Sequence, residues 1–453
     1  MSHWWEHPIR RLVSGRRVIL AGGVAPVWVL AAPLVRRLGA AHVLVVATEG
    51  RGMGPAPDEP TVTVEPPPGL SLMDTVRFGV DTLREPPEEV RTGVTDFDPH
   101  GEAVVIGMFL NESPALFGRP FVSHRRPAWV ALEDKTVIDQ LWDDADVARA
   151  ASETVALPDA ADTARRIDLG DGTVWALDAR GGWHGGGHLT RWVRNAADAA
   201  PTAAELARHG THVRVMPFLD GVPCSIHGIV CDDGVAVLRP VEMVTLRRGH
   251  DLFYAGCATF WDPPDALRAE MRAVGRAVGD HLAARVAFRG GFTVDGVATV
   301  DGFRPTELNP RPGAGLGVLG RGLPDGFPLL LLLDLIAGGV DVDRSAQELE
   351  DELLTAADRS RAGGTWRFGL EVGLSITDEP RWFVDGEWTD IDTAGAPGAT
   401  LGAGARGVRL TLDPATWPAG PSVAPAAAAL YRHLDEHHGT SFGPLTPAPD
   451  VTA

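Results

Sequence analysis

Polar side chains in the segment Glu307-Leu308-Asn309-Pro310-Arg311 have types and a spacing that could do chemistry. Alternate side chains of a β-strand project to the same face, so Glu307, Asn309 and Arg311 are expected to lie together. Asp295 lies upstream, in a stretch that reads as the adjacent strand. Two carboxylates and an amide oxygen suit Mg²⁺, and an arginine beside them can bind a phosphoryl group through two parallel hydrogen bonds. The segment therefore predicts a site for a metal ion and a phosphate.

The alternative for these residues is a solvated polar strand edge that is balanced by an ion pair. A glycine-rich stretch, 312–317, follows at once and makes this alternative less favourable, because glycines let a ligand approach the backbone closely. Gly313 and Gly315 in this stretch are therefore candidate substrate contacts.

Strand and helix patterns along the chain must position this site. The region from 211 onward is rich in strand patterns, and Asp232-Asp233-Gly234 predicts a hairpin turn. A helix pattern at 264–282 leads into the strand pair that carries the polar residues. Other predicted elements are a helix that carries Lys135, strands at 173–177, 367–377 and 408–412, a helix at 426–437, and a buried helix at 328–336.

The first 130 residues alternate short apolar strands with helices and predict a small doubly wound α/β domain. The uncharged run 18–35 approaches the length of a membrane span. Gly22-Gly23 followed by Pro26 instead indicates a strand, a tight turn and a helix start, so we favour this interpretation over a signal peptide or anchor. The two glycines do not complete a GxGxxG fingerprint, so a dinucleotide site here is a weak alternative.

The composition excludes several classes of protein. The chain has 453 residues, 41 basic and 60 acidic side chains and a net charge of −19, which speaks against binding nucleic acid through bulk charge. Its three cysteines form no CxxC pair, which indicates a reducing, cytoplasmic compartment without disulfides or structural zinc. We expect no nucleic-acid and no membrane partner. Lys135 is the only lysine of the chain.

The ordered set of motifs over about 131–320 resembles the ATP-grasp superfamily of carboxylate–amine ligases. The segment ALEDK resembles its first nucleotide lysine, 181–187 its glycine loop, and 215–219 its hinge. The resemblance implies Mg²⁺ ligands at Asp295, Glu307 and Asn309, and ATP contacts at Lys135, Leu177, Arg180, Gly182, Gly185, Gly186, Met216, Phe218, Leu219 and Leu308. It further implies catalytic roles for Arg311, Asn309 and Arg248.

The chain departs from the family pattern at three positions. The second lysine, usual before the glycine loop, is absent, and the segment offers Asp178 and Arg180 instead. Asp295 stands where glutamate is usual. Met216 occupies a hinge position that is often acidic, so the backbone would have to read the adenine. These departures leave room for a catalytically weak or repurposed member.

Two further groups are candidates. Arg247, Arg248 and His250 follow a strand in the region where the family places substrate-facing residues; we weigh an active-site role evenly against a solvated loop. His433 and His437 lie one helical turn apart without an evident third ligand, so solvent-facing histidines are the better interpretation than a zinc site.

The resemblance implies an α/β fold in which an N-terminal Rossmann-like domain precedes two ATP-grasp subdomains that clamp the nucleotide. We assign the N-terminal domain to 1–130, the first subdomain with its glycine loop to 131–218, and the second, with the metal site, to 219–340. A C-terminal α/β region at 341–453 completes the ligase, with a disordered tail from about residue 443.

The predicted activity is that of an ATP- and Mg²⁺-dependent ligase. It would activate a carboxylic acid, such as an amino acid or a peptide-like acid, as an acyl phosphate and couple it to an amine in small-molecule biosynthesis. The alternatives are a kinase-like phosphotransferase and a nucleotide-binding scaffold without turnover. A homodimer is expected from the frequency of such assemblies.

Overall fold

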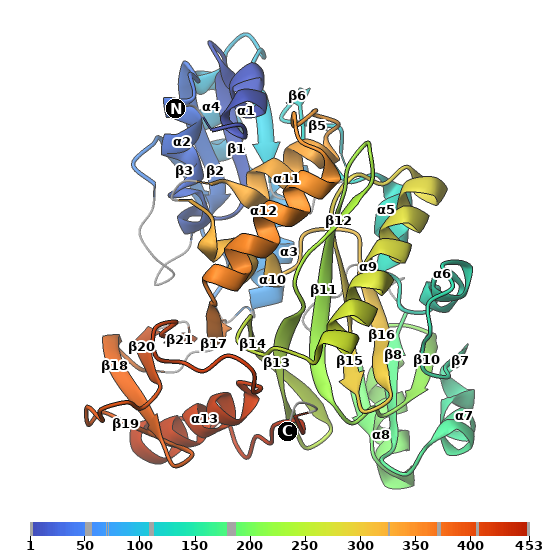
Figure 1. The fold of residues 1–453 in the computed structure, drawn as a ribbon. Coiled ribbons are helices and arrows are strands. Elements are labelled where there is room, and N and C mark those ends of the chain that lie inside the picture. The colour runs from blue at the N-terminus through green and yellow to red at the C-terminus, as the bar shows by residue number, and fades with distance from the viewer. Residues whose placement is uncertain are drawn as a thin grey trace.

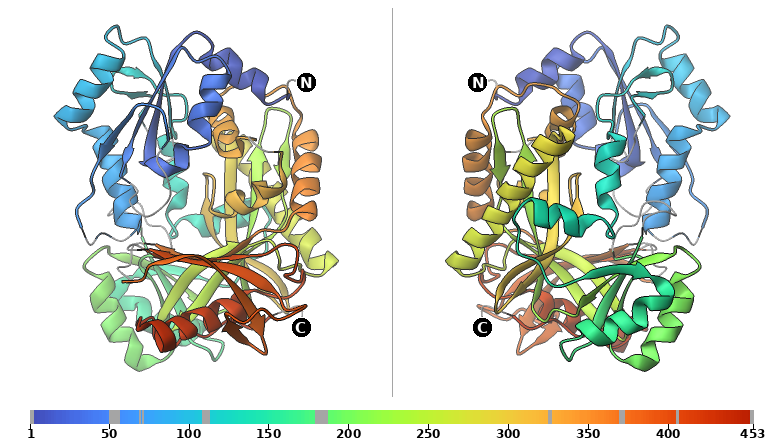
Figure 2. Two further views of the ribbon diagram at one scale, coloured as in Figure 1. Left: turned by 90° about the vertical axis from the view of Figure 1, so that its left-hand side faces the viewer. Right: turned by 90° about the vertical axis from the view of Figure 1, so that its right-hand side faces the viewer.

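The structure, a computed structural model, places the N-terminal domain at one end of the molecule, with the first subdomain and a C-terminal module at the opposite end and the second subdomain in the middle (Figures 1 and 2). It describes residues 3–49, 57–68, 70, 72–107, 113–178, 187–324, 327–368, 373–404 and 407–450.

The N-terminal domain is a parallel sheet with helices on both faces, as predicted. The strands run in the order β3-β2-β1-β4, and both faces are buried, since Val18 and Leu20 pack on one side and Ile19 on the other. The elements are α1 (Glu6–Val13), β1 (Arg17–Val24), η1 (Ala25–Trp28), α2 (Ala31–Arg37), β2 (His42–Thr48), β3 (Thr61–Val64), α3 (Leu72–Arg84), α4 (Glu88–Phe97) and β4 (Val104–Gly107).

The uncharged run 18–35 is divided between β1, η1 and α2, which confirms the predicted strand and helix, whereas Gly22 and Gly23 lie at an irregularity within β1 and not in a turn after it. No helix within the described ranges has both the length and the hydropathy of a membrane span.

A connecting segment joins this domain to the subdomains. It contains β5 (Ala115–Leu116), β6 (Arg119–Pro120), α5 (Pro127–Val130), η2 (Ala131–Glu133) and α6 (Ile138–Asp144). Trp129, Leu141 and Trp142 pack into the core of the second subdomain. Lys135 lies in the turn between η2 and α6, so the prediction that a helix carries it is wrong; Asp134 accepts hydrogen bonds from the backbone and hydroxyl of Thr136 and stabilises the turn instead.

The first subdomain is an antiparallel sheet in the order β7-β10-β8-β9. Its helices cover one face over an apolar core that includes Trp175, Leu177 and Val213. The elements are β7 (Glu153–Ala156), η3 (Leu157–Asp159), α7 (Ala160–Ile167), β8 (Thr173–Leu177), β9 (Thr190–Val193), α8 (Ala196–Leu206) and β10 (His212–Pro217).

The second subdomain has a central sheet in the order β16-β15-β11-β13-β14, with β12 paired to β11. α9 covers one face, and α11 lies between this sheet and the N-terminal domain, where Leu331 and Leu335 enter that domain's core (Figure 1). The elements are β11 (Val222–Val230), β12 (Val235–Val237), β13 (Val241–Arg248), β14 (Asp251–Ala258), α9 (Asp265–Val286), β15 (Gly290–Thr299), β16 (Gly302–Asn309), α10 (Gly315–Leu319), η4 (Gly320–Gly322), α11 (Leu329–Ala337) and α12 (Ala346–Arg359).

The C-terminal module continues the same sheet in the order β14-β17-β21-β20-β18-β19. Its elements are β17 (Gly363–Phe368), β18 (Ile376–Val384), β19 (Glu387–Thr389), β20 (Gly398–Gly404), β21 (Gly407–Leu412) and α13 (Ala424–His438). The prediction of a disordered tail is wrong for residues 443–450. Thr446 exchanges two backbone hydrogen bonds with Arg247 at 2.8 and 3.0 Å, and Asp450 accepts one from the Ser422 backbone.

Glu242 on β13 fastens α13 to the central sheet. Its buried carboxylate accepts hydrogen bonds from the Ser422 hydroxyl at 2.6 Å and from the backbone N–H groups of Val423 and Ala424 at 2.9 and 3.2 Å. Burial raises the pKa of Glu242 to about 7, although these donors oppose the shift.

Glu242 gives a pH-dependent prediction. A raised pKa means that the folded state binds the proton more tightly, so this contribution to stability is complete below pH 4.5 and is lost as the pH rises toward 7. The free energy of unfolding of the wild type, relative to Glu242→Gln, is expected to fall by about 2 kcal/mol between pH 5 and pH 7.5 in urea denaturation. Glu387→Gln, on the exposed edge strand of the C-terminal module, is the control. Parallel pH curves for wild type and Glu242→Gln would contradict the prediction.

Candidate functional site

Two carboxylates face each other across neighbouring strands. The antiparallel pairing of β15 with β16 sets Asp295 opposite Glu307 and Thr293 opposite Asn309. Val294 and Leu308 pack in the core under α9, so the alternating site residues project to the other face. The predicted strand pair and the shared face of Glu307 and Asn309 are therefore confirmed.

Hydrogen bonds connect these polar groups. Asn309 Nδ2 donates to Asp295 Oδ2 at 2.9 Å, and Arg311 Nη2 donates to Asn309 Oδ1 at 2.9 Å. The Ser225 hydroxyl on β11 donates to Asp295 Oδ1 at 2.5 Å. Ser225 was not predicted; it lies directly opposite Asp295 because β11 is the other neighbour of β15, a strand order that the local sequence pattern does not reveal.

The two carboxylates are partly buried on paired strands. Burial and then the neighbouring charge of Glu307 raise the pKa of Asp295 to about 7, while the hydrogen bond from Ser225 and the charges of Arg311 and Lys135 lower it. A divalent cation between the two carboxylates would remove their repulsion, so the residues present fit Mg²⁺.

Among the described residues, no three His, Cys, Asp or Glu side chains are grouped so that they could hold a metal ion. A Mg²⁺ ion at this place would therefore be bound by Asp295, Glu307 and the amide oxygen of Asn309, with phosphate or water oxygens completing its shell.

Three cations bind acidic side chains at or beside the site. Lys135 Nζ lies 3.2 Å from Glu307 Oε1. Glu133 Oε1 accepts hydrogen bonds from Arg311 Nε at 2.9 Å and from Arg125 Nη2 at 2.8 Å. Glu133 and Arg125 were not predicted. Glu133 lies two residues before Lys135, so the segment ALEDK supplies both a phosphate-binding candidate and a carboxylate that orients Arg311.

The residues predicted to form the hinge lie at the end of β10 and directly after it. Met216 is buried, and its Sδ accepts a hydrogen bond from Arg214 Nη1 at 3.4 Å. Phe218 N–H donates to the carbonyl oxygen of Gly172 at 2.9 Å, so this backbone group is already engaged. Leu219 is half-buried. The role of these residues in binding adenine stays a prediction.

Two predicted nucleotide contacts lie in apolar cores. Leu308 belongs to the core under α9, because alternation along β16 carries it to the face opposite Glu307 and Asn309. Leu177 belongs to the core that α7 and α8 cover. The predictions for Arg180, Gly182, Gly185 and Gly186 fall outside the described residues.

The loop after Arg311 closes over the sheet beside the site. A Cβ atom added to Gly313 would lie 2.5 Å from Thr293 Oγ1, and one added to Gly315 would lie 2.4 Å from His227 Cε1. Both glycines therefore permit a close approach of the loop backbone. Their contact with substrate stays a prediction.

The two adjacent arginines, Arg247 and Arg248, contact different residues. Arg247 forms an ion pair with Asp220, and its guanidinium lies 4.9 Å from the ring centroid of Phe218. Arg248 lies over the Phe253 ring and pairs with Asp251 at 3.4 Å.

His250 is exposed, and its backbone accepts a hydrogen bond from Trp192 N–H. Within the described parts of the chain, the hydrogen bonds and ion pairs found do not link Arg247, Arg248 or His250 to the carboxylate site. Their assignment to substrate therefore stays a prediction, and the observed contacts connect Arg247 with Phe218 of the predicted hinge.

Solved structures with the same architecture identify the fold. N5-carboxyaminoimidazole ribonucleotide synthetase, in an ADP complex, is 14% identical over 94% of this chain and 98% of that chain, with a TM-score of 0.53. The biotin carboxylase of Campylobacter jejuni, in a β,γ-ATP complex, is 14% identical over 82% and 79%, with a TM-score of 0.57. The biotin carboxylase domain of Hydrogenobacter thermophilus 2-oxoglutarate carboxylase, with MgADP and bicarbonate, is 15% identical over 88% and 86%, with a TM-score of 0.57.

No protein-family model matches the sequence, and a sequence search of curated proteins finds no match. At 14–15% identity the structural similarity establishes the fold alone. The N-terminal Rossmann-like domain and the ATP-grasp fold predicted from the sequence are thereby confirmed.

Proposed function

We propose that the protein is an ATP- and Mg²⁺-dependent ligase that activates a carboxylate as an acyl phosphate and couples it to an amine. The observation that carries the proposal is the convergence of Asp295, Glu307 and Asn309 with Lys135 and Arg311 on one face of the sheet. In solved structures that share this fold, ADP, MgADP or an ATP complex is bound.

The charged groups of the site pair with one another, and bound ATP and Mg²⁺ would have to replace some of these pairs. Lys135 pairs with Glu307, and Arg311 pairs with Glu133 and Asn309. On binding ATP, Lys135 would transfer from Glu307 to the phosphates. Asn309 would turn its amide oxygen from Arg311 toward the metal position. Mg²⁺ bound there would supply positive charge to the β- and γ-phosphates.

The residues of the chain would then orient and neutralise the reactants. An oxygen of the substrate carboxylate attacks the γ-phosphorus, the bond to ADP breaks, and Arg311 steadies the charge on the transferred phosphoryl group. The amine nitrogen next attacks the acyl carbon; inorganic phosphate leaves, and the amine loses a proton. Glu133 would hold Arg311 in place through both steps.

Bicarbonate is a specific candidate for the acid. One of the similar structures contains bicarbonate together with MgADP. With bicarbonate as the carboxylate, the same two steps would transfer a carboxyl group to an amine or another nucleophile.

The decisive test combines ADP detection with product mass. The protein is incubated with ATP, Mg²⁺ and pooled carboxylic acids, amino acids and bicarbonate, with hydroxylamine added in parallel to trap an acyl phosphate as a hydroxamate. We expect ADP release that requires an acid and Mg²⁺, and a condensed product. A stable phosphorylated product without condensation would indicate a phosphotransferase. Tight ATP binding without ADP across the panel would indicate a scaffold.

A further inference from the structure

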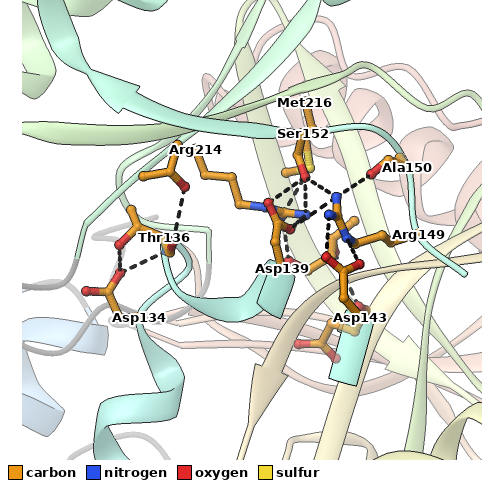
Figure 3. Close-up of polar contacts among 12 residues, drawn as sticks. Asp134, Thr136, Asp139, Asp143, Arg149, Ala150, Ser152, Arg214 and Met216 are labelled. Carbon is orange, nitrogen blue, oxygen red and sulfur yellow. Dashed lines mark hydrogen bonds and ion pairs between the residues drawn. The ribbon is translucent and has the colours of Figure 1, made fainter. Parts of the chain in front are cut away.

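Arg214 is a fully buried cation where three segments of the chain meet. It lies on β10, two residues before Met216, and is 1% exposed. Its Nε donates to Asp139 Oδ1 at 2.8 Å, its Nη2 to Ser152 Oγ at 3.1 Å, and its Nη1 to the carbonyl oxygen of Thr306 at 3.1 Å. Figure 3 shows Arg214, Asp139, Ser152 and Met216 turned toward one another. One guanidinium thus joins the hinge strand, the connecting segment and the strand that carries Glu307.

Supporting contacts keep this cation in one position. Ser152 donates to Asp139 Oδ2 at 2.7 Å, and Arg149 donates to Ser152 at 3.1 Å while binding both oxygens of Asp143 (Figure 3). A buried guanidinium is costly unless its hydrogen bonds are satisfied, and here each nitrogen has a partner. These direct partners of Arg214 therefore fix the direction of its side chain.

The contact with Thr306 falls on an irregularity of β16. Glu307 pairs with Asp295 and Pro305 pairs with Gly296, so Thr306 is the extra residue of a β-bulge. The Thr306 hydroxyl donates to the carbonyl oxygen of Asp295 at 3.3 Å. A one-residue slip of this strand would turn Glu307 and Asn309 to the face that α9 covers. The bulge therefore sets which face carries the metal residues.

We propose that Arg214 is a positioning residue that holds this bulge from the first subdomain and thereby fixes Glu307 in the metal site. The proposal rests on the proposed function for its catalytic consequence. Because the same guanidinium contacts Met216 on the hinge strand, a change at the nucleotide hinge is transmitted to the strand of Glu307 through one side chain. Asp139 and Ser152 keep that side chain extended between the two subdomains.

The test compares Arg214→Met with Arg149→Met, a variant of the same cluster that does not touch β10 or β16. Hydrogen exchange is followed in residues 302–309 without ligand, and ADP formation is followed against Mg²⁺ concentration. For Arg214→Met we expect exchange about tenfold faster and a half-saturating Mg²⁺ concentration about tenfold higher, as the loss of a hydrogen bond to a charged group implies. Arg149→Met is expected to stay within about threefold of wild type in both. Arg214→Lys should recover part of the loss.

Two results would overturn the proposal. The first is that Arg214→Met shows the same hydrogen-exchange rate in 302–309 and the same half-saturating Mg²⁺ concentration as the wild type. The second is that Arg149→Met changes both quantities as much as Arg214→Met does, which would indicate a general loosening of the cluster. If Arg214→Met does not fold, Arg214→Lys and Asp139→Asn carry the same comparison. Absence of Mg²⁺-dependent ADP formation in wild type would overturn the ligase assignment, whereas the exchange comparison needs no ligand and still decides whether Arg214 holds the bulge.

Discussion

Replacing Glu307 by glutamine is expected to slow ADP formation about a hundred- to a thousandfold while the protein stays folded. The substitution keeps the size of the side chain and removes one of the two carboxylate charges that face each other across β15 and β16. It also leaves Lys135 without the partner that lies 3.2 Å away. The loss is expected mainly in turnover, because the carboxylate acts on charge at the transferred phosphate.

The measurement is a coupled assay of ADP release at saturating ATP and Mg²⁺, with circular dichroism and thermal unfolding as tests of the fold. Glu379→Gln is a matched control, because Glu379 is 49% exposed on β18 and pairs only with Arg381 among the ion pairs found in the described residues. If Glu307→Gln releases ADP in the presence of substrate at the wild-type rate, the proposal that Glu307 binds the metal ion is wrong.

The local pattern of the sequence was sufficient to predict which side chains of the candidate site share a face. Alternation along one strand is a property of consecutive residues, so Glu307 and Asn309 could be assigned to one face from the sequence alone. The same alternation places Leu308 on the other face, and the assignment of Leu308 to the nucleotide overlooked it. It also separates Arg247 from Arg248, which contact different rings.

Contacts between residues far apart in the sequence could not be predicted from local patterns. Ser225 joins the site because β11 lies beside β15, and Arg214 reaches Thr306 across 92 positions of the sequence. The tail has a loop-like composition, yet Thr446 pairs with Arg247, which no local signal reveals. Glu133 could have been predicted from the sequence, since it belongs to the same segment, ALEDK, as Lys135.

The remaining large effect is expected from Lys135→Arg, which keeps the charge and changes its shape. Lys135 is the single lysine among 41 basic residues, its side chain is 10% exposed, and the turn stabilised by Asp134 and Thr136 directs it to Glu307. An ammonium is a compact point charge, whereas a guanidinium is a broad planar fork that this enclosed position would have to accommodate. The value of kcat/KM for ATP is expected to fall about a hundredfold.

The effect of this substitution is measured as ATP affinity and turnover in parallel. The control is Arg165→Lys, the opposite substitution at an exposed position of α7. If shape is decisive, Lys135→Arg and Lys135→Met should both lose ATP use, and the arginine variant should not recover it at higher Mg²⁺, because its bulk persists when the carboxylates are neutralised. If charge alone were decisive, Lys135→Arg would match the wild type and only Lys135→Met would fail. Wild-type affinity and turnover in Lys135→Arg would thus make the lone lysine an accident of an arginine-rich composition, and would leave Arg311 and Arg125 as the cations on which phosphate binding depends.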